Sequence, residues 1–97
     1  MEFDVVNDGP TAIVTISGEL DIANIEELEA AVEPVIVRKP DRLVIDVGGL
    51  RFADSSAIAL WVRWAASVGE IELRDVSPLL QRVIGSMGLD QKLRLTT

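Results

Sequence analysis

The residues best suited to chemistry are two adjacent serines, Ser55 and Ser56, that follow Asp54. They stand between an apolar stretch typical of a strand, 42–47, and a run typical of a helix, 58–68. A hydroxyl at such a junction meets the positive end of the helix dipole, where an anion is stabilised. The hydroxyl of Ser55 can therefore serve as a phosphate acceptor, because unpaired N–H groups of the first helical turn can bind the phosphate. A serine there can equally be a simple N-cap, and the local sequence leaves both interpretations open.

No general base accompanies these serines, because the chain has no histidine and no cysteine. Ser-His-Asp and Cys-His nucleophiles and thiolate zinc sites are therefore excluded. Asp21, Asp46 and Asp54 have oxygen ligands for a divalent metal, but Asp46 alternates within a strand and points elsewhere. Gly48-Gly49 lacks a following Gly-Lys-Ser/Thr, which excludes a P-loop and favours a tight turn. We expect a protein that is not an enzyme and needs no metal or cofactor.

Composition indicates one globular domain over residues 1–97, with 48% hydrophobic and 26% charged residues. Nine basic residues against sixteen acidic ones give a net charge of −7. This balance argues against binding to nucleic acid or an anionic membrane and favours a basic partner protein. No signal-peptide pattern is present, and no apolar run approaches the ~20 residues that span a bilayer, so we expect a cytoplasmic protein.

The first half of the chain reads as a hairpin followed by a helix. Two alternating stretches, 3–7 and 11–17, are joined by an Asn-Asp-Gly-Pro turn, which predicts an antiparallel pair. Asn24 with Glu27 has the spacing of a capping box and predicts the start of the helix. Pro34 falls inside its apolar repeat, so we expect it to kink the helix or to end its regular stretch near Glu33.

The second half alternates strands and helices. Four apolar residues in 43–47 predict a strand buried on both faces, typical of the centre of a parallel sheet. After the helix at 58–68, residues 70–74 alternate as a further strand. Ser77, followed by proline, is a favourable N-cap for a third helix that Gly88 should end as a left-handed cap. The tail, 92–97, is long enough for a short edge strand.

The element order is therefore β-β-α-β-α-β-α. It predicts an α/β fold with a mixed sheet of four to five strands, in which an N-terminal antiparallel hairpin precedes mostly parallel strands, and three helices pack on the sheet. The loops 18–24 and 48–55 both follow parallel strands, so they should meet at one edge of the sheet, where such folds bind ligands. Asp21 and Asp54 would then form a negative rim around Ser55. The alternative for Asp21 is an Asx turn with no further role.

The second helix carries a further apolar pair, Leu60 and Trp64, one turn apart. The helical spacing places another set toward the sheet, namely Ile58, Trp61 or Val62, Ala65 and Val68. Leu60 and Trp64 then point more outward, either under a neighbouring helix or into solvent. If exposed, they would anchor a partner, because Trp is over-represented among binding hot spots.

Two motifs together resemble a known family. Ser17-Gly-Glu-Leu-Asp21, followed by a stretch over 46–56 that ends in Phe52-Ala-Asp-Ser-Ser56, is similar to the STAS domain of bacterial anti-sigma factor antagonists over nearly the whole chain. The resemblance implies that an anti-sigma factor with serine kinase activity phosphorylates Ser55. The unphosphorylated form would bind that anti-sigma factor and release the sigma factor, and a phosphatase would restore it. The chain would thus be a phosphoprotein that regulates transcription by partner switching, and ATP would belong to the kinase.

The sequence departs from the family where Gly-Leu-Gly commonly follows the serines, because this chain has Ala57-Ile58-Ala59. The added methyl groups stand where a partner backbone would approach, which puts the specificity for a kinase in question. Our candidate partner-binding residues are Asp21, Asp54, Ser56, Ala57, Leu60 and Trp64. The alternative function is a constitutive STAS adaptor in a lipid-transport or stress-signalling complex, in which Ser55 is not phosphorylated.

Overall fold

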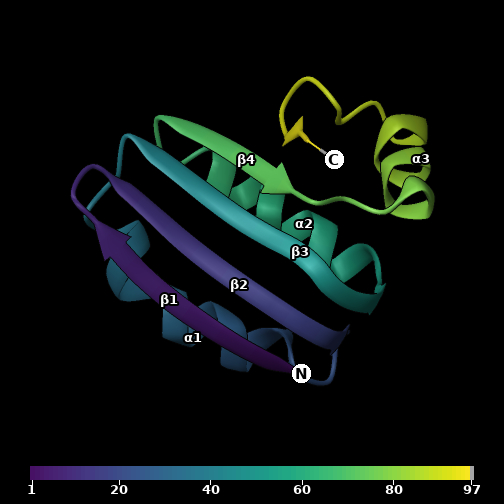
Figure 1. Cartoon of the computed structure of the whole chain (residues 1–97), viewed down its shortest axis with the longest axis horizontal. Coiled ribbons are helices and arrows are strands. Elements are labelled where there is room, and N and C mark those ends of the chain that lie inside the picture. Colours follow the sequence, from purple (N-terminus) through teal and green to yellow (C-terminus); the bar gives the residue numbers. More distant parts are fainter. Residues whose placement is uncertain (97) are drawn as a thin grey trace.

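The computed structural model describes residues 1–96 and has a five-stranded mixed sheet with three helices (Figure 1). The strands lie in chain order, with β1 antiparallel to β2 and every later neighbour parallel. This confirms the predicted fold class. The elements are β1 (Glu2–Asp8), β2 (Thr11–Leu20), α1 (Ile25–Ile36), β3 (Arg42–Ala53), α2 (Ser55–Ala65), β4 (Glu70–Arg74), α3 (Pro78–Ser86) and β5 (Arg94–Leu95).

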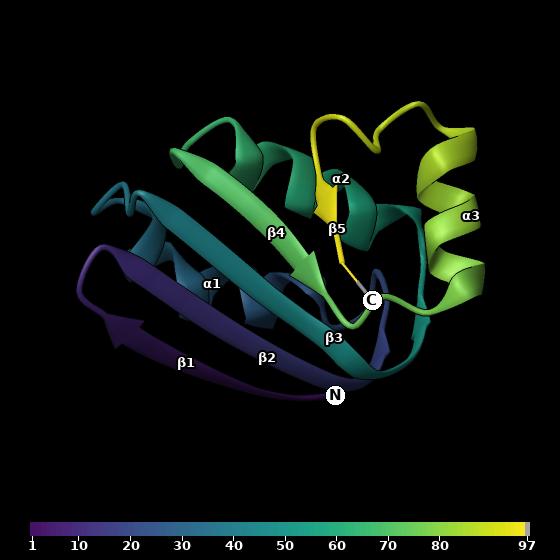
Figure 2. The same ribbon diagram turned by 45° about the horizontal axis from the view of Figure 1, so that its top comes forward.

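The helices are placed unevenly around the sheet. α1 and α2 cover one face, and α3 stands at the end of the sheet where β3 and β4 finish (Figures 1 and 2). Alternate residues of the strands, such as Val14, Ile45 and Leu73, are fully buried in the core shared with α1 and α2. This two-layer packing leaves the carboxyl ends of the parallel strands open beside α3.

The central strand β3 is buried on both faces near its start, as its apolar run predicts. Leu43 and Ile45 belong to the core beneath the helices, and Val44, which alternates with them, is also 0% exposed. On the same face as Val44, Glu72 is buried and accepts hydrogen bonds from Arg42 and, at 3.2 Å, from Nε of Arg74. Burial raises the pKa of Glu72, but the hydrogen bonds and charges of the two arginines outweigh it and hold this pKa below its usual value.

The first helix begins where predicted, after Asn24, but it differs in its end and in its capping. α1 continues past Pro34 to Ile36, so the proline does not end it. Because Pro34 has no N–H, the carbonyl of Ala30 has no hydrogen-bond donor four residues later in the helix. Ala30 is exposed, so water can donate to its carbonyl oxygen. Asn24 occupies the N-cap, but its side chain makes no cap hydrogen bond, so the expected capping box is absent.

The strands before the two polar loops are longer than expected. β3 runs through Ala53, and its pairing with β2 reaches Leu20 opposite Ala53 after two register shifts. Gly48 and Gly49 therefore lie within a strand, and the expected tight turn is wrong. A Cβ on Gly48 would lie 2.1 Å from the Asp75 carboxylate, and one on Gly49 would lie 2.8 Å from Cβ of Ser17. Close approach of neighbouring segments is what requires glycine here.

The second helix was predicted at 58–68, but α2 begins and ends three residues earlier, at Ser55 and Ala65. The predictions for the third helix and the tail agree with the structure. Ser77 caps α3 by accepting a hydrogen bond from the Leu80 N–H at 3.2 Å, and Gly88 follows the helix with a φ of 72°. A short edge strand, β5, occupies Arg94–Leu95, while Thr97 lies outside the described residues. Over residues 1–96, no helix is long and apolar enough to cross a membrane.

Candidate functional site

The two polar loops leave the sheet at adjacent positions, as predicted from the strand order. Leu20 and Ala53 are register partners at the ends of β2 and β3, and the Asp54 N–H donates to the Leu20 carbonyl at 3.2 Å. The loop that begins at Asp21 and the start of α2 at Ser55 therefore lie side by side. The structure places Asp21, Asp54 and the serines on one edge of the molecule.

Asp54 organises this edge through both of its carboxylate oxygens. Oδ1 accepts from the N–H groups of Ser56 at 3.0 Å and Ala57 at 3.3 Å, which makes Asp54 the N-cap of α2. Oδ2 accepts from the Ile22 N–H at 3.2 Å and so joins the two loops. The hydrogen bond from the Ser56 hydroxyl is the largest cause that lowers the pKa of Asp54. The backbone N–H groups of Ala57, Ile22 and Ser56 reinforce it against burial, so Asp54 is ionised at neutral pH.

The two serines have different roles. Ser56 is half-buried, and its hydroxyl donates to Asp54. Ser55 is the first residue of α2 and is exposed, and within residues 1–96 its hydroxyl has no hydrogen-bond partner. Since Asp54 caps the helix, the interpretation of Ser55 as a cap is wrong. The structure thus leaves the Ser55 hydroxyl accessible at the positive end of a helix.

Asp21 forms an Asx turn, with its Oδ1 accepting from the Ala23 N–H at 2.9 Å. The Asn24 side chain completes this loop. Its Oδ1 accepts from the Asp21 N–H at 3.0 Å, and its Nδ2 donates to the Glu19 carbonyl at 2.8 Å. Asn24 therefore bonds backward to the loop instead of forward to the helix. These bonds hold Asp21, which is half-buried, at the edge beside Asp54.

Three of the candidate partner-binding residues are inaccessible. Ala57 and Leu60 are 0% exposed and Trp64 is 3% exposed. Of the two alternatives for Leu60 and Trp64, the position under a neighbouring helix is confirmed, because α1 packs beside α2 and both side chains are buried. Their assignment as partner-binding residues is wrong. Trp64 lies against α1, where it shares a shallow depression with Ile36 and Glu29. A partner can therefore meet only the exposed side of this edge.

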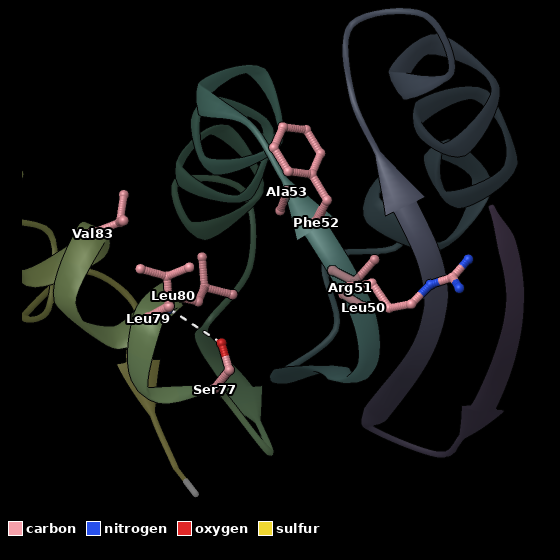
Figure 3. Close-up of a pocket in the computed structure, with 8 residues that line it drawn as sticks. All are labelled: Leu50, Arg51, Phe52, Ala53, Ser77, Leu79, Leu80 and Val83. Atoms are coloured by element: carbon pink, nitrogen blue, oxygen red, sulfur yellow. Dashed lines mark hydrogen bonds between the residues drawn. The ribbon is translucent and has the colours of Figure 1, made fainter.

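Apolar side chains next to the edge were missed by the sequence interpretation. Ile22, in the first loop, is 74% exposed, and Phe52, near the end of β3, is 51% exposed. A groove of about 240 Å³ runs between the end of β3 and α3, with Leu79, Leu80 and Val83 on its α3 side (Figure 3). The helical spacing of Leu79 and Val83 was a usable signal, but it also fits a helix that is buried on that side.

The acidic side chains at this edge do not gather as a metal site. Asp46 turns to its own strand, where its Oδ1 accepts from the Gly48 N–H at 3.0 Å. Within the described part of the chain, no three acidic side chains lie close enough together to hold a metal ion, so the grouping of Asp21, Asp46 and Asp54 is not formed. What the edge offers is an exposed hydroxyl, a helix N-terminus and two carboxylates.

Comparisons with known proteins identify the family to which this fold and this edge belong. A family model described as "Mlab, STAS domain" matches residues 3–97. The anti-sigma-F factor antagonist RsfB of Mycobacterium tuberculosis is 29% identical over 94 residues, which cover 94% of this chain and 77% of RsfB. The crystal structure of an anti-sigma factor antagonist from Mycobacterium paratuberculosis superposes with a TM-score of 0.86 at 26% identity, covering 97% of this chain and 83% of that one. The phosphorylated form of SpoIIAA from Bacillus shares the fold, with a TM-score of 0.77 at 22% identity over 99% of this chain and 92% of that one.

Proposed function

Because the chain belongs to the STAS domain family, we propose that it is an anti-sigma factor antagonist controlled by phosphorylation of Ser55. In this proposal the unphosphorylated protein binds an anti-sigma factor with serine kinase activity, and the sigma factor is released. The names of two similar mycobacterial proteins, both anti-sigma factor antagonists, support this choice.

The division of roles between Asp54 and Ser55 is the observation that carries the proposal. Asp54 satisfies the first N–H groups of α2, so the Ser55 hydroxyl is not needed to stabilise the helix. It is exposed at the helix start, where a kinase can reach it. Ser56 is half-buried and hydrogen-bonded to Asp54, which favours Ser55 as the acceptor.

A phosphate on Ser55 would change the charge of the edge at the point of contact. It would add about −1.5 to −2 charges beside the ionised Asp54 carboxylate. Against an acidic group of the partner ~5 Å away, at an effective dielectric constant of ~40, the repulsion is on the order of 3 kcal/mol. That energy corresponds to roughly a hundredfold weaker binding, which is enough for a switch.

The proposed contact surface consists of the accessible residues around Ser55. Asp21, Asp54 and Ser56 line it, held in place by the hydrogen bond from Ile22 to Asp54. Ala57 is buried, so its methyl group does not obstruct the approach of a kinase.

The test uses the purified protein, ATP and each purified anti-sigma factor kinase of the source organism. We expect one kinase to place a single phosphate on Ser55, located by mass spectrometry, and to lose about a hundredfold in affinity for the product. Ser55→Ala should abolish the modification. Ser56→Ala is the matched control and should still be modified.

The proposal fails if no kinase modifies Ser55, or if the phosphorylated and unphosphorylated proteins bind equally well. The second result, with a stable complex that persists in both states, would favour the constitutive adaptor.

A further inference from the structure

Exposed large apolar side chains are concentrated at one end of the molecule. Ile22, Phe52, Leu79, Val83 and Met87 lie where β2 and β3 finish or along α3, with exposed fractions of 74%, 51%, 68%, 38% and 48%. Val6 and Val37 are the remaining pair in the described chain, and both lie near the opposite ends of the strands. Exposed apolar patches of this kind mark interaction sites more often than scattered single residues do.

The groove between β3 and α3 is the centre of this patch. Its β3 side is formed by residues 50–53, and its α3 side includes Leu79 and Val83. In Figure 3, the side chains of Leu79 and Leu80 lie together on the α3 side of the groove, while the Arg51 side chain extends away from α3. A volume of about 240 Å³ is below the ~300 Å³ at which small-molecule pockets usually begin, so a few protein side chains fit it better than a cofactor.

The spacing on α3 suits another helix. Leu79, Val83 and Met87 follow one another at four-residue intervals and form a stripe along the helix. Such a stripe beside a groove is the pattern by which an amphipathic helix is bound.

The charge around the groove differs from that of the rest of the chain. The segments 48–53 and 77–89 contain none of the sixteen acidic residues and carry two arginines, Arg51 and Arg82. Arg82 is exposed and stands three residues after Leu79, on the neighbouring row of the helix surface. By contrast, Asp54 directly follows the groove residue Ala53 and begins the acidic edge. The groove and Ser55 are therefore neighbouring parts of one surface, which is basic along the groove and acidic beside Ser55.

We propose that this groove binds an amphipathic helix of the anti-sigma factor, with apolar side chains between Phe52 and Leu79 and an acidic side chain beside Arg82. The inference rests on the proposed function and adds the place and chemistry of the contact. Since Ala53 precedes Ser55 by two residues, a phosphate on Ser55 acts at the border of the groove.

The experiment measures the dissociation constant for the anti-sigma factor kinase that modifies Ser55 with ATP. Leu79→Ser and Phe52→Ser remove apolar contacts from two elements. Both side chains are at least half exposed, so the fold should persist, which the urea midpoint checks. We expect each to weaken binding about tenfold or more, as truncation of a hot-spot residue does. Val37→Ser, at a residue 64% exposed near the opposite end of the strands, is the matched control and should change affinity less than about twofold.

A charge reversal tests whether the partner places an acidic side chain beside Arg82, as proposed. Arg82→Glu should weaken binding, and more so at low salt, because it repels the acidic group assigned to the partner. Arg38→Glu makes the same change in net charge at an exposed residue after α1 and should have little effect.

The outcomes separate the two proposals. If no kinase binds the protein, the proposed function fails, and the groove assignment falls with it. If a kinase binds and modifies Ser55, but Leu79→Ser and Phe52→Ser bind as tightly as the parent, only the groove assignment is wrong. A second copy of the chain is the alternative occupant of the groove, and sedimentation of the protein alone tests it. A dimer that Leu79→Ser dissociates would assign the groove to that second copy and overturn the proposal.

Discussion

At the scale of single residues, the Asp54 carboxylate determines the hydrogen bonding of the two serines that follow it. Asp54 accepts four hydrogen bonds, from the backbone of Ile22, Ser56 and Ala57 and from the Ser56 hydroxyl. An aspartate and a serine are about equally good N-caps, so residue type alone did not assign the role. With Asp54 as the cap, the exposed Ser55 hydroxyl has no part in capping the helix, whereas the Ser56 hydroxyl donates to Asp54.

We expect Asp54→Ala to destabilise the protein by about 0.5–2 kcal/mol, because the N-cap of α2 is lost. The free energy of unfolding in urea at pH 7 measures this change. Asp54→Asn should cost less, since Asn caps helices about as well as Asp, although it loses the acceptor for the Ile22 N–H. Asp4→Ala, on an exposed position of β1, is the control for removing a carboxylate. An Asp54→Ala variant as stable as the parent would contradict the assigned cap.

At the scale of elements, packing between segments explains where glycine is required. Gly69 begins the approach to β4, and a Cβ there would lie 2.5 Å from the Asp41 backbone carbonyl oxygen. Gly85 lies in α3, and a Cβ there would meet no atom within 4 Å. Packing therefore requires glycine at position 69 but not at position 85, and neither residue has a positive φ.

We expect Gly69→Ala to destabilise the protein by about 1–3 kcal/mol, because the backbone of Asp41 must shift to accept the methyl group. Gly85→Ala should stabilise it by about 0.5–1 kcal/mol, since Ala favours a helix over Gly. Urea unfolding of both variants gives the comparison. Equal effects of the two substitutions would show that the close approach at Gly69 is not a constraint.

Element packing also decides between the two alternatives for Leu60 and Trp64 on α2. Its sequence has apolar residues on two flanks, and periodicity alone did not reveal which flank meets a neighbour. α1 covers the flank of Leu60 and Trp64, so these residues belong to the core. The exposed apolar stripe lies instead on α3, whose buried residues within the helix are limited to Ile84.

At the scale of the whole molecule, two ionised carboxylates link folding to pH. Asp54 and Glu72 have pKa values below their ordinary values of 3.8 and 4.5. The unfolded chain therefore binds more protons than the folded one as pH falls through this region. The stability that both groups contribute is present above these ordinary values and is lost as pH falls through the lower values of the folded state.

We expect the free energy of unfolding to be nearly constant above about pH 5 and to fall below about pH 4.5. Glu72→Gln should lower stability at pH 7 by about 1–3 kcal/mol, because a buried partner of Arg42 and Arg74 loses its charge. The variant should also lose less stability than the parent on acidification. Urea unfolding at several pH values tests both, and an unchanged slope in Glu72→Gln would exclude Glu72 as a source of the dependence.

Much of the architecture follows from the sequence alone. Alternating and helical apolar repeats predicted the order of strands and helices, and the apolar run of β3 predicted its central position. The strand order then brought the loops at Asp21 and Asp54 to one edge. The lack of histidine and cysteine excluded nucleophilic triads by composition alone. These features depend on local pattern and composition, which a sequence contains in full.

The tertiary structure decided how that edge is built and which surface lies beside it. Whether Asp54 or Ser55 caps α2 depends on the residue at which the helix starts, and one residue changes which N–H groups need an acceptor. Burial of Trp64 depends on α1, and the groove joins Phe52 to Leu79 from separate elements. A pattern of residues shows which side chains are apolar. Only the packing of distant segments determines which of them remain at the surface, because burial is a property of neighbours.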